Sequence, residues 1–165
     1  MNFSPREFRS ALGVFPTGVS IVTARTQSGR HIGITVNSFA SVSLDPPLIS
    51  FNLAKSLVSY RDLIEVETFA VNLLTDAQSR VSHSFACAGT DKWSCVTSSI
   101  GPTANPIIEP NAAVFECSRY AQFEAGDHLI VVGRVLRFAV NENEAPLVFF
   151  RGAYRAVGEL IQDRS

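Results

Sequence analysis

Residues 33–47 read GITVNSFASVSLDPP, which combines the start of a strand with a run of small polar side chains and two prolines. A strand that only fills a core has no need of so many hydroxyl and amide groups. An edge strand with outward-facing Ser and Thr explains the pattern about as well as a binding site does. Small side chains also allow a planar ligand to approach the backbone, whose N–H and C=O groups can bind the edge of a heterocycle.

The composition favours one domain with a large apolar surface to bury. The chain has 165 residues, of which 46% are hydrophobic and 18% are charged, and its mean hydropathy is +0.17. This length fits a single domain over residues 1–165. Because soluble domains usually contain about 25% charged residues, we expect either an unusually large core or an apolar face buried in a homodimer, and we favour the homodimer.

Charge and hydropathy argue against several classes of protein. The net charge is −1 without a basic run, which argues against nucleic-acid binding. No segment approaches the roughly 18 continuous apolar residues of a membrane span. The N-terminal segment MNFSPREFRS carries charges where a signal peptide has an apolar run, so we expect a cytoplasmic protein. Three cysteines at irregular spacing suit reduced thiols better than disulfides.

The familiar catalytic motifs are absent from the sequence. It contains no glycine-rich dinucleotide motif, no P-loop and no nucleophile elbow. His83, Cys87 and Cys95 have a spacing that matches no structural zinc pattern, and buried cysteines commonly act as small hydrophobic residues. We therefore predict no metal site.

Short strands are predicted to outnumber helices along the chain. Ser4 as N-cap, Pro5 at the first helical position and Glu7 three residues after the cap predict the start of a helix. Two further helices are expected behind caps at Ser56 and Asp76. The expected helices cover residues 4–15, 56–66 and 76–86, and the expected strands cover residues 16–25, 32–43, 47–53 and 68–74. Residues 86–111 are predicted to form a loop, and residues 112–140 a long hairpin with its turn at Gly126 and Asp127. This order contains no strict βαβ alternation, so we predict a mainly β fold with helices, an antiparallel β-barrel decorated by helices.

Two places could bind a phosphate. Lys55, Ser56 and Ser59 surround the start of the second predicted helix, where free N–H groups and the positive end of the helix dipole favour an anion. An ordinary N-cap with a solvated lysine is the simpler alternative. Lys92 could be a second phosphate contact or a surface charge.

Two further places could contact a ring system. His128 lies at the turn of the long hairpin, where it is either a generic turn residue or a donor at the mouth of a barrel. Arg151 and Tyr154 follow the last predicted strand and offer a cation and an aromatic ring. A strand-end tyrosine whose hydroxyl reaches solvent is the alternative.

The combination of these segments is more specific than any one of them. In order, FPTGVSIVT, GITVNSFASVSLDPPLISF, FAVNLL, DKW, GDHLIVVGRV and PLVFFRGAY resemble the short flavin reductases. These are NAD(P)H:flavin oxidoreductases that serve as the small component of two-component flavin-dependent monooxygenases. The resemblance runs from about Phe8 to Tyr154, and the NSF-x-S-V-S-L-D-P-P and GDH elements are its most specific parts.

The resemblance implies a split β-barrel of the flavin reductase and FMN-binding type, a homodimer, and FMN or FAD bound near the dimer interface. The residues that it places along the isoalloxazine ring are Thr35, Val36, Asn37, Ser38, Phe39 and Ala40. Those placed at the ribityl chain and phosphate are Ser41, Ser43, Ser56, Ser59, Phe85, Ala86 and Lys92. Those placed at the nicotinamide nucleotide are His128, Arg151, Gly152, Ala153 and Tyr154.

The activity that this resemblance implies is hydride transfer from C4 of a nicotinamide to N5 of the flavin. The protein then has to stack and orient two rings, which requires no acid–base pair, so His128 is expected to position the nicotinamide. The reduced flavin is expected to diffuse to a separate oxygenase. The sequence does not separate FMN from FAD, and the lack of an obvious arginine pair for a 2′-phosphate favours NADH over NADPH.

Two other classes of protein stay open. A non-enzymatic flavin or haem carrier on the same barrel would bind its ligand without NAD(P)H-dependent turnover, although it would not need the GDH and RGAY elements. A pyridoxamine-phosphate-type oxidase would bring more arginines to the phosphate, whereas residues 56–66 contain only Arg61.

Overall fold

The computed structural model describes residues 3–89 and 91–159, which are mainly β-strands. The helices are α1 (Pro5–Leu12), α2 (Tyr60–Glu65) and α3 (Ser79–Ala86), and a 3-10 turn (Asp76–Gln78) precedes α3. The strands are β1 (Thr17–Gly18), β2 (Ser20–Arg25), β3 (His31–Val36), β4 (Ala40–Leu44), β5 (Pro47–Ala54), β6 (Thr68–Leu73), β7 (Thr97–Ile100), β8 (Pro106–Glu109), β9 (Ala113–Ala125), β10 (His128–Val140), β11 (Val148–Phe150) and β12 (Ala153–Arg155).

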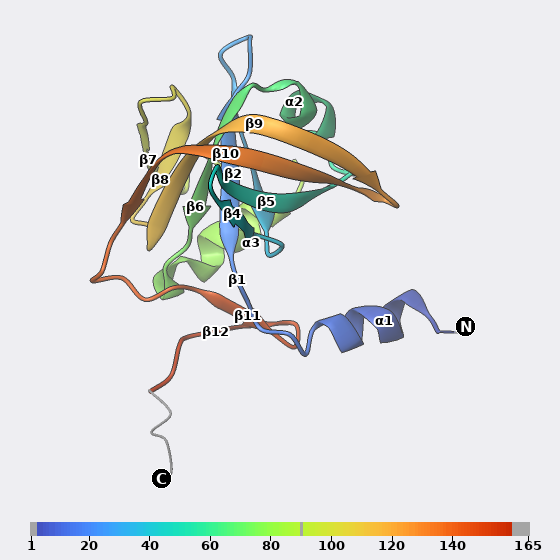
Figure 1. The fold of residues 1–165 in the computed structure, drawn as a ribbon. Coiled ribbons are helices and arrows are strands. Elements are labelled where there is room, and N and C mark those ends of the chain that lie inside the picture. Colours follow the sequence, from blue (N-terminus) through green and yellow to red (C-terminus); the bar gives the residue numbers. More distant parts are fainter. Residues whose placement is uncertain (1–2, 90, 160–165) are drawn as a thin grey trace.

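One curved sheet of seven strands forms the body of the protein (Figure 1). Its order is β3-β2-β6-β9-β10-β5-β4, and every ladder in it is antiparallel. Two smaller antiparallel sheets, β7-β8 and β1-β11-β12, complete the strands that the structure describes. The prediction of a mainly β, antiparallel fold is therefore confirmed, and β3 and β4 are the two edges of the main sheet.

The single strand predicted for residues 32–43 is wrong, because β3 and β4 are separate strands at opposite edges of the sheet. The chain leaves β3 after Val36 and enters β4 at Ala40. In between, the Ser38 hydroxyl accepts a hydrogen bond of 2.8 Å from the backbone N–H of Asn52 on β5. This bond fixes the bend beside β5, where β4 then pairs.

The loop predicted for residues 86–111 is also partly wrong, since it contains the hairpin β7–β8. Buried polar groups of the main sheet hold this hairpin. The Asn72 side chain accepts a hydrogen bond of 2.9 Å from the backbone N–H of Ile108, and the Thr23 hydroxyl donates to the carbonyl of Pro106. Residues far away in the sequence therefore stabilise the hairpin, and a local reading could not detect it.

The starts of the helices differ from the predictions in two of three cases. Ser4 and Glu7 form the predicted capping box of α1, with the Ser4 N–H donating to the Glu7 carboxylate at 2.7 Å. By contrast, α2 begins at Tyr60 rather than behind a Ser56 cap. The turn before α3 is closed by Gln78, whose side-chain oxygen accepts from the Thr75 N–H at 2.9 Å, and not by the expected cap.

The apolar residues of α1 and of the segment after it are not buried by the described part of the chain. Phe8 is 52% exposed, Leu12 58% and Phe15, just after the helix, 74%. Figure 1 shows α1 beside the β11–β12 hairpin and away from the main sheet. The contact between them includes a backbone hydrogen bond of 2.8 Å from the Arg151 N–H to the Gly13 carbonyl.

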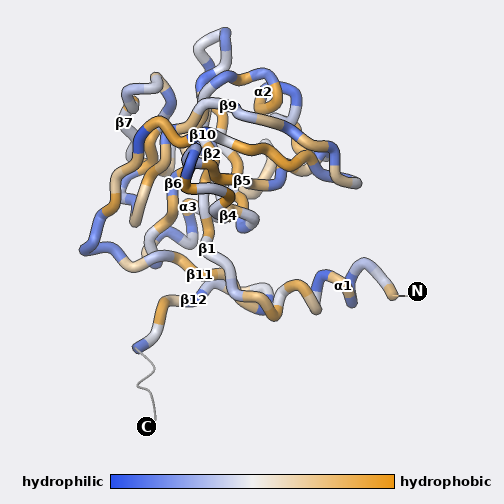
Figure 2. The backbone as a smooth tube through the Cα atoms, in the orientation of Figure 1, coloured by the Kyte–Doolittle hydropathy of each residue, from blue (hydrophilic) through white to orange (hydrophobic). Residues whose placement is uncertain are grey.

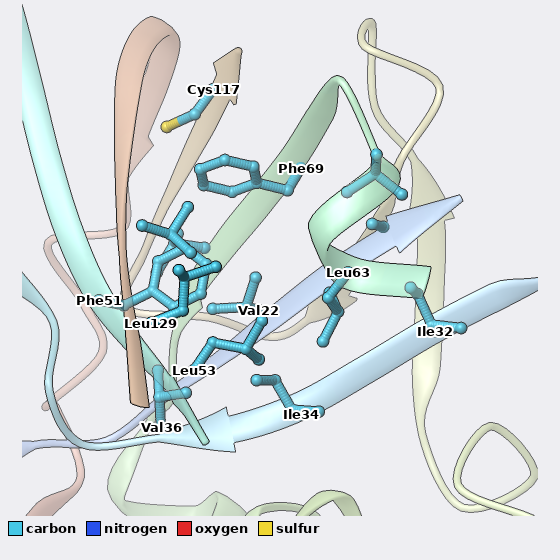
Figure 3. Packing of buried hydrophobic residues seen from close by; sticks show 14 of the residues in the cluster. Val22, Ile32, Ile34, Val36, Phe51, Leu53, Leu63, Phe69, Cys117 and Leu129 are labelled. Carbon is cyan, nitrogen blue, oxygen red and sulfur yellow. The ribbon is translucent and has the colours of Figure 1, made fainter. Parts of the chain in front are cut away.

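Two hydrophobic clusters form the core. The larger lies within the curved sheet and includes Val22, Phe51 and Leu53 (Figure 3). The smaller includes Phe85 of α3 and Leu147, and it joins α3 to the sheet. Hydrophobic residues follow the strands and hydrophilic residues gather in the connecting turns (Figure 2). Within the described residues, no helix is both long and apolar enough to cross a membrane.

Candidate functional site

The outer edge of β3 is one of the two places in the main sheet where the backbone is not paired with a neighbouring strand. The Trp93 indole N–H donates to the carbonyl of His31 at 3.2 Å, and the Lys92 ammonium donates to the carbonyl of Gly33 at 3.3 Å. In an extended strand the N–H and C=O of alternate residues point to the same side, and β2 pairs with β3 on the opposite side from the His31 and Gly33 carbonyls. The N–H and C=O of Thr35, two residues further along, therefore also face this edge.

The close approach of α3 to β3 depends on Gly33. A Cβ built on Gly33 would lie 2.5 Å from Cε1 of Phe85 in α3, far inside van der Waals contact. Phe85 is only 1% exposed, and its ring meets that of Trp93 edge-on with centroids 5.1 Å apart. Glycine at this position allows the helix to pack directly against the edge strand.

The hydroxyl of Thr35 joins β3 to α3. It donates a hydrogen bond of 2.7 Å to the carbonyl of Ser82. The hydroxyl of Ser82, which is fully buried, lies 2.8 Å from the hydroxyl of Tyr154 on β12. Three segments that are distant in the sequence are thus linked side by side at the end of β3.

Lys92 is a half-buried cation without a carboxylate partner among the described residues. Its ammonium group donates to the carbonyls of Gly33 at 3.3 Å and of Phe85 at 3.1 Å. Burial lowers the pKa of Lys92, because removal from water disfavours the charged form. An ammonium group has three N–H donors, so one stays available for a ligand.

A cavity of about 230 Å³ opens beside Lys92. Its walls come from β3, from the turn before α2 and from the loop after α3, and they include Gly33, Val58, Ser59, Gly89 and Trp93. The structure therefore brings Ser59 and Lys92, which the sequence assigned to the phosphate, to one cavity. Ser56 is exposed in the preceding turn and does not line it.

The other residues predicted to hold the flavin have varied positions. Asn37, Ala40 and Ser41 are exposed along the bend between β3 and β4 and the start of β4, and Ala86 is exposed at the end of α3. Val36 and Phe85 are buried, and Phe39 packs on the ring of Phe115 with centroids 5.5 Å apart. Ser43 is half-buried on β4. The hydroxyl of Ser38 already accepts the Asn52 N–H described above.

The predicted nicotinamide contacts lie on two separate turns. On the turn between β9 and β10, the Nδ1 atom of His128 lies 2.8 Å from the carboxylate of Asp127, and this hydrogen bond lowers the pKa of Asp127. Lys55 also binds this turn, donating to the carbonyl of Gly126 at 2.9 Å and pairing with Glu124. Lys55 is therefore directed to the hairpin turn and not to the start of α2.

The second turn, between β11 and β12, holds Arg151 and Gly152 in left-handed conformations, with φ of 49° and 75°. The guanidinium of Arg151 lies 5.2 Å from the centroid of the Phe150 ring. Ala153 is half-buried, and Tyr154 packs on Phe149 with ring centroids 5.6 Å apart. Within the described part of the chain, no hydrogen bond, ion pair or ring contact joins this turn to His128.

The polar clusters do not resemble a metal site in the residues that the structure describes, where no three metal-ligating side chains come together. The Sγ of Cys87 lies 3.6 Å from Nε2 of His83, and all three cysteines are free thiols. Burial raises the pKa of Cys117 to about 12, so this thiol stays protonated in the core.

The sequence offered no signal for Ser82, whose contacts with Thr35 and Tyr154 depend on how α3 packs on β3.

Comparison with known proteins identifies the family. A family model described as a flavin reductase like domain matches residues 12–158. A probable flavin reductase of Rhizobium meliloti (strain 1021) is 45% identical over 92% of the chain and 49% of its own length, so the chain spans about half of that relative. The FMN reductase (NADH) SmoA of Agrobacterium fabrum is 45% identical over 90% of the chain and 84% of its own length. The structure of the NADH:FAD oxidoreductase SgcE6 of Streptomyces globisporus C-1027, in complex with NAD and FAD fragments, superposes with a TM-score of 0.87 and 31% identity over 100% of this chain and 99% of that one. The chain belongs to the family of flavin reductase like domains.

Proposed function

We propose that the chain is an NAD(P)H-dependent flavin reductase that reduces FMN or FAD and supplies the reduced flavin to a separate monooxygenase. The observation that carries the proposal is the outer edge of β3, where the backbone of Thr35 faces outward two residues beyond Gly33, and Gly33 lines the cavity beside the half-buried cation Lys92. Relatives 40% and 34% identical to the chain are named as reductase components of flavin-dependent monooxygenases, which supports the supply of an oxygenase.

The residues present at β3 fit a flavin. Backbone N–H and C=O groups at a sheet edge can bind the polar edge of an isoalloxazine, and we place the ring along Thr35, Val36, Asn37, Ser38, Phe39 and Ala40. Ser41 and Ser43 are assigned to the ribityl chain. The half-buried ammonium of Lys92 and the neighbouring Ser59 are assigned to the phosphate, since a cation with a free donor in a cavity favours an anion.

The chemistry proposed for this site is carried by its two ligands, because a bound flavin supplies N5 as the hydride acceptor and a nicotinamide nucleotide supplies C4 as the donor. The chain orients them. The carboxylate of Asp127 accepts the Nδ1–H of His128, which fixes the tautomer and leaves Nε2 to face the nicotinamide. Arg151, Gly152 and Ala153 are assigned to the rest of the nucleotide. NADH is the favoured donor, in keeping with the names of two relatives.

We further propose that residues 1–165 form a single domain in which the curved sheet is a split barrel, and that two chains form a homodimer. The support for the dimer is the apolar surface that the described residues leave open. It includes Phe15 near α1, 74% exposed, and Phe138 and Val140 at the end of β10, 68% and 62% exposed. A second copy of the chain would remove such surfaces from water.

The test of the activity is NADH oxidation by the purified protein with and without added FMN, FAD or riboflavin. We expect oxidation that depends on added flavin, and the most efficient flavin gives the preference. NADPH in place of NADH gives the preference for the donor. Protein that binds flavin but oxidises neither nucleotide would contradict the proposal and favour a carrier.

Lys92→Met is expected to weaken flavin binding, since it removes the cation from the phosphate cavity and keeps most of the side-chain volume. Loss of one charge-assisted hydrogen bond corresponds to roughly a tenfold rise in the KM for FMN or FAD. The KM for riboflavin, which lacks the phosphate, should change much less. Arg61→Met is the control, because it removes an exposed cation of α2 that does not line the cavity. Equal losses for FMN and riboflavin would show that Lys92 does not bind phosphate.

His128→Ala is expected to raise the KM for NADH or to lower kcat, since the imidazole positions the nicotinamide. The Kd for oxidised flavin, measured by quenching of its fluorescence, should stay the same. Asp127→Asn should have the same effect to a smaller degree, because it weakens the hold on the imidazole without removing it. Unchanged kcat and unchanged KM for NADH in His128→Ala would rule out the assigned role.

The homodimer is expected to have a mass twice the 17.9 kDa of one chain in sedimentation equilibrium. A Phe8→Ser/Phe15→Ser double variant should have a higher dissociation constant for the dimer, because it removes apolar surface that the dimer would bury. Gln27→Ser, in the turn between β2 and β3, is the polar surface control. A wild-type monomer at all concentrations would contradict the dimer.

A further inference from the structure

The hydroxyl of Tyr154, a residue of β12, lies 2.8 Å from the hydroxyl of Ser82 on α3. The family resemblance had instead assigned Tyr154 to the nicotinamide nucleotide. We propose that Tyr154 and Ser82 are positioning residues that hold the Thr35 hydroxyl as a hydrogen-bond acceptor for the ring N–H of an oxidised flavin. This inference rests on the proposed function, because it needs a flavin at β3. The new element is a role for Tyr154 and Ser82 in flavin recognition.

The direction of the Thr35 hydrogen bond carries the first step. A hydroxyl has one hydrogen and two lone pairs. The hydrogen of Thr35 is directed to the carbonyl of Ser82, at an O···O distance of 2.7 Å. Toward the free edge of β3 the hydroxyl can therefore only accept, and it cannot donate to a ring carbonyl.

The chemistry of the ligand gives the second step. The oxidised isoalloxazine, which must bind before it can be reduced, has a single ring N–H, at N3, between two carbonyl groups. An oxygen that can only accept is repelled by those carbonyls and attracted by that N–H. The Thr35 backbone N–H, at the same edge, is the kind of donor that an adjacent ring carbonyl requires.

The third step is how α3 is held. Ser82 is fully buried, and its hydroxyl has the Tyr154 hydroxyl 2.8 Å away. The Tyr154 ring is fixed in turn by its edge contact with Phe149. Removal of the Tyr154 hydroxyl leaves the buried Ser82 hydroxyl without this partner, which favours a shift of α3 and of the carbonyl that orients Thr35.

The two roles for Tyr154 differ in which substrate they affect. Tyr154→Phe removes one oxygen atom and keeps the ring. If Tyr154 acts through Ser82 and Thr35, the KM and Kd for flavin rise by roughly two- to tenfold and the KM for NADH stays within about twofold of the wild type. If Tyr154 binds the nicotinamide nucleotide, the KM for NADH rises and the Kd for flavin does not.

The experiment combines five variants with fluorescence titration of flavin and steady-state kinetics. Thr35→Val should match the loss in Tyr154→Phe, and the double variant should lose no more than the larger single effect, because both act on one hydroxyl. Thr35→Ser keeps the hydroxyl and should stay near wild type. Tyr120→Phe, on the exposed part of β9, is the matched tyrosine control and should change nothing.

A modified ligand tests the same contact without any change at Tyr154. Wild-type protein should bind N3-methylriboflavin more weakly than riboflavin, and Thr35→Val should reduce that difference. The inference is overturned if Tyr154→Phe changes only the KM for NADH, if it changes neither constant, if the Thr35 and Tyr154 effects add, or if the methyl group makes the same difference in Thr35→Val as in wild type. Failure of flavin-dependent NADH oxidation in the wild type would instead overturn the proposed activity, and the flavin titrations would still test the contact.

Discussion

The docking of α3 on the edge strand β3 determines the rest of the site. The Phe85 ring occupies the space that a side chain on residue 33 would fill, so the helix can approach only because that residue is glycine. Once docked, the helix and the loop after it deliver two donors, from Lys92 and Trp93, to the carbonyls of β3. An open sheet edge invites pairing with other strands, and here most of the edge is occupied by the chain's own side chains. What stays open is the end at Thr35.

The electrostatics of the site follow from the same docking. Lys92 is drawn out of water by its two carbonyl contacts, and burial lowers its pKa because the carbonyls compensate only in part for the lost hydration. A dianionic phosphate in the adjacent cavity would favour the charged ammonium and reverse that shift. Arg30, at the rim of the same cavity, is paired with Asp62 at 2.7 Å, which offsets its charge, whereas the hydrogen bonds of Lys92 within the described residues go to neutral carbonyl groups.

Features fixed by neighbouring residues could be predicted from the sequence. The capping box of α1 and the long β9–β10 hairpin with its turn at Gly126 and Asp127 are of this kind. The split of residues 32–43 into two strands could not be predicted, since the bend is held by Asn52 on another strand. The β7–β8 hairpin depends in the same way on buried groups of β2 and β6.

The candidate site also contains residues that the sequence could indicate and contacts that it could not. Lys92 could be singled out as a candidate phosphate contact because it lies in DKW, one of the segments that resemble the short flavin reductases. The two carbonyl partners of Lys92 depend on how α3 packs on β3, so they could not be predicted from the sequence. Ser82 has no local signal at all, because a serine in a helix is unremarkable until its carbonyl and hydroxyl are seen to connect Thr35 with Tyr154.

The site proposed at the sheet edge would also suit a flavin that has to leave. The groups assigned to the ring are a few backbone atoms and one hydroxyl whose orientation is fixed in advance, so little side-chain entropy is lost when the ring binds and little has to rearrange when it leaves. Specificity then comes from the fixed pattern of donors and acceptors, since a misplaced ring leaves polar groups unpaired. The cation assigned to the phosphate would add affinity for FMN and FAD. Specificity for the ring and affinity for the phosphate would then come from different groups. The ring could be recognised without being held tightly, as the proposed delivery of reduced flavin to a second protein requires.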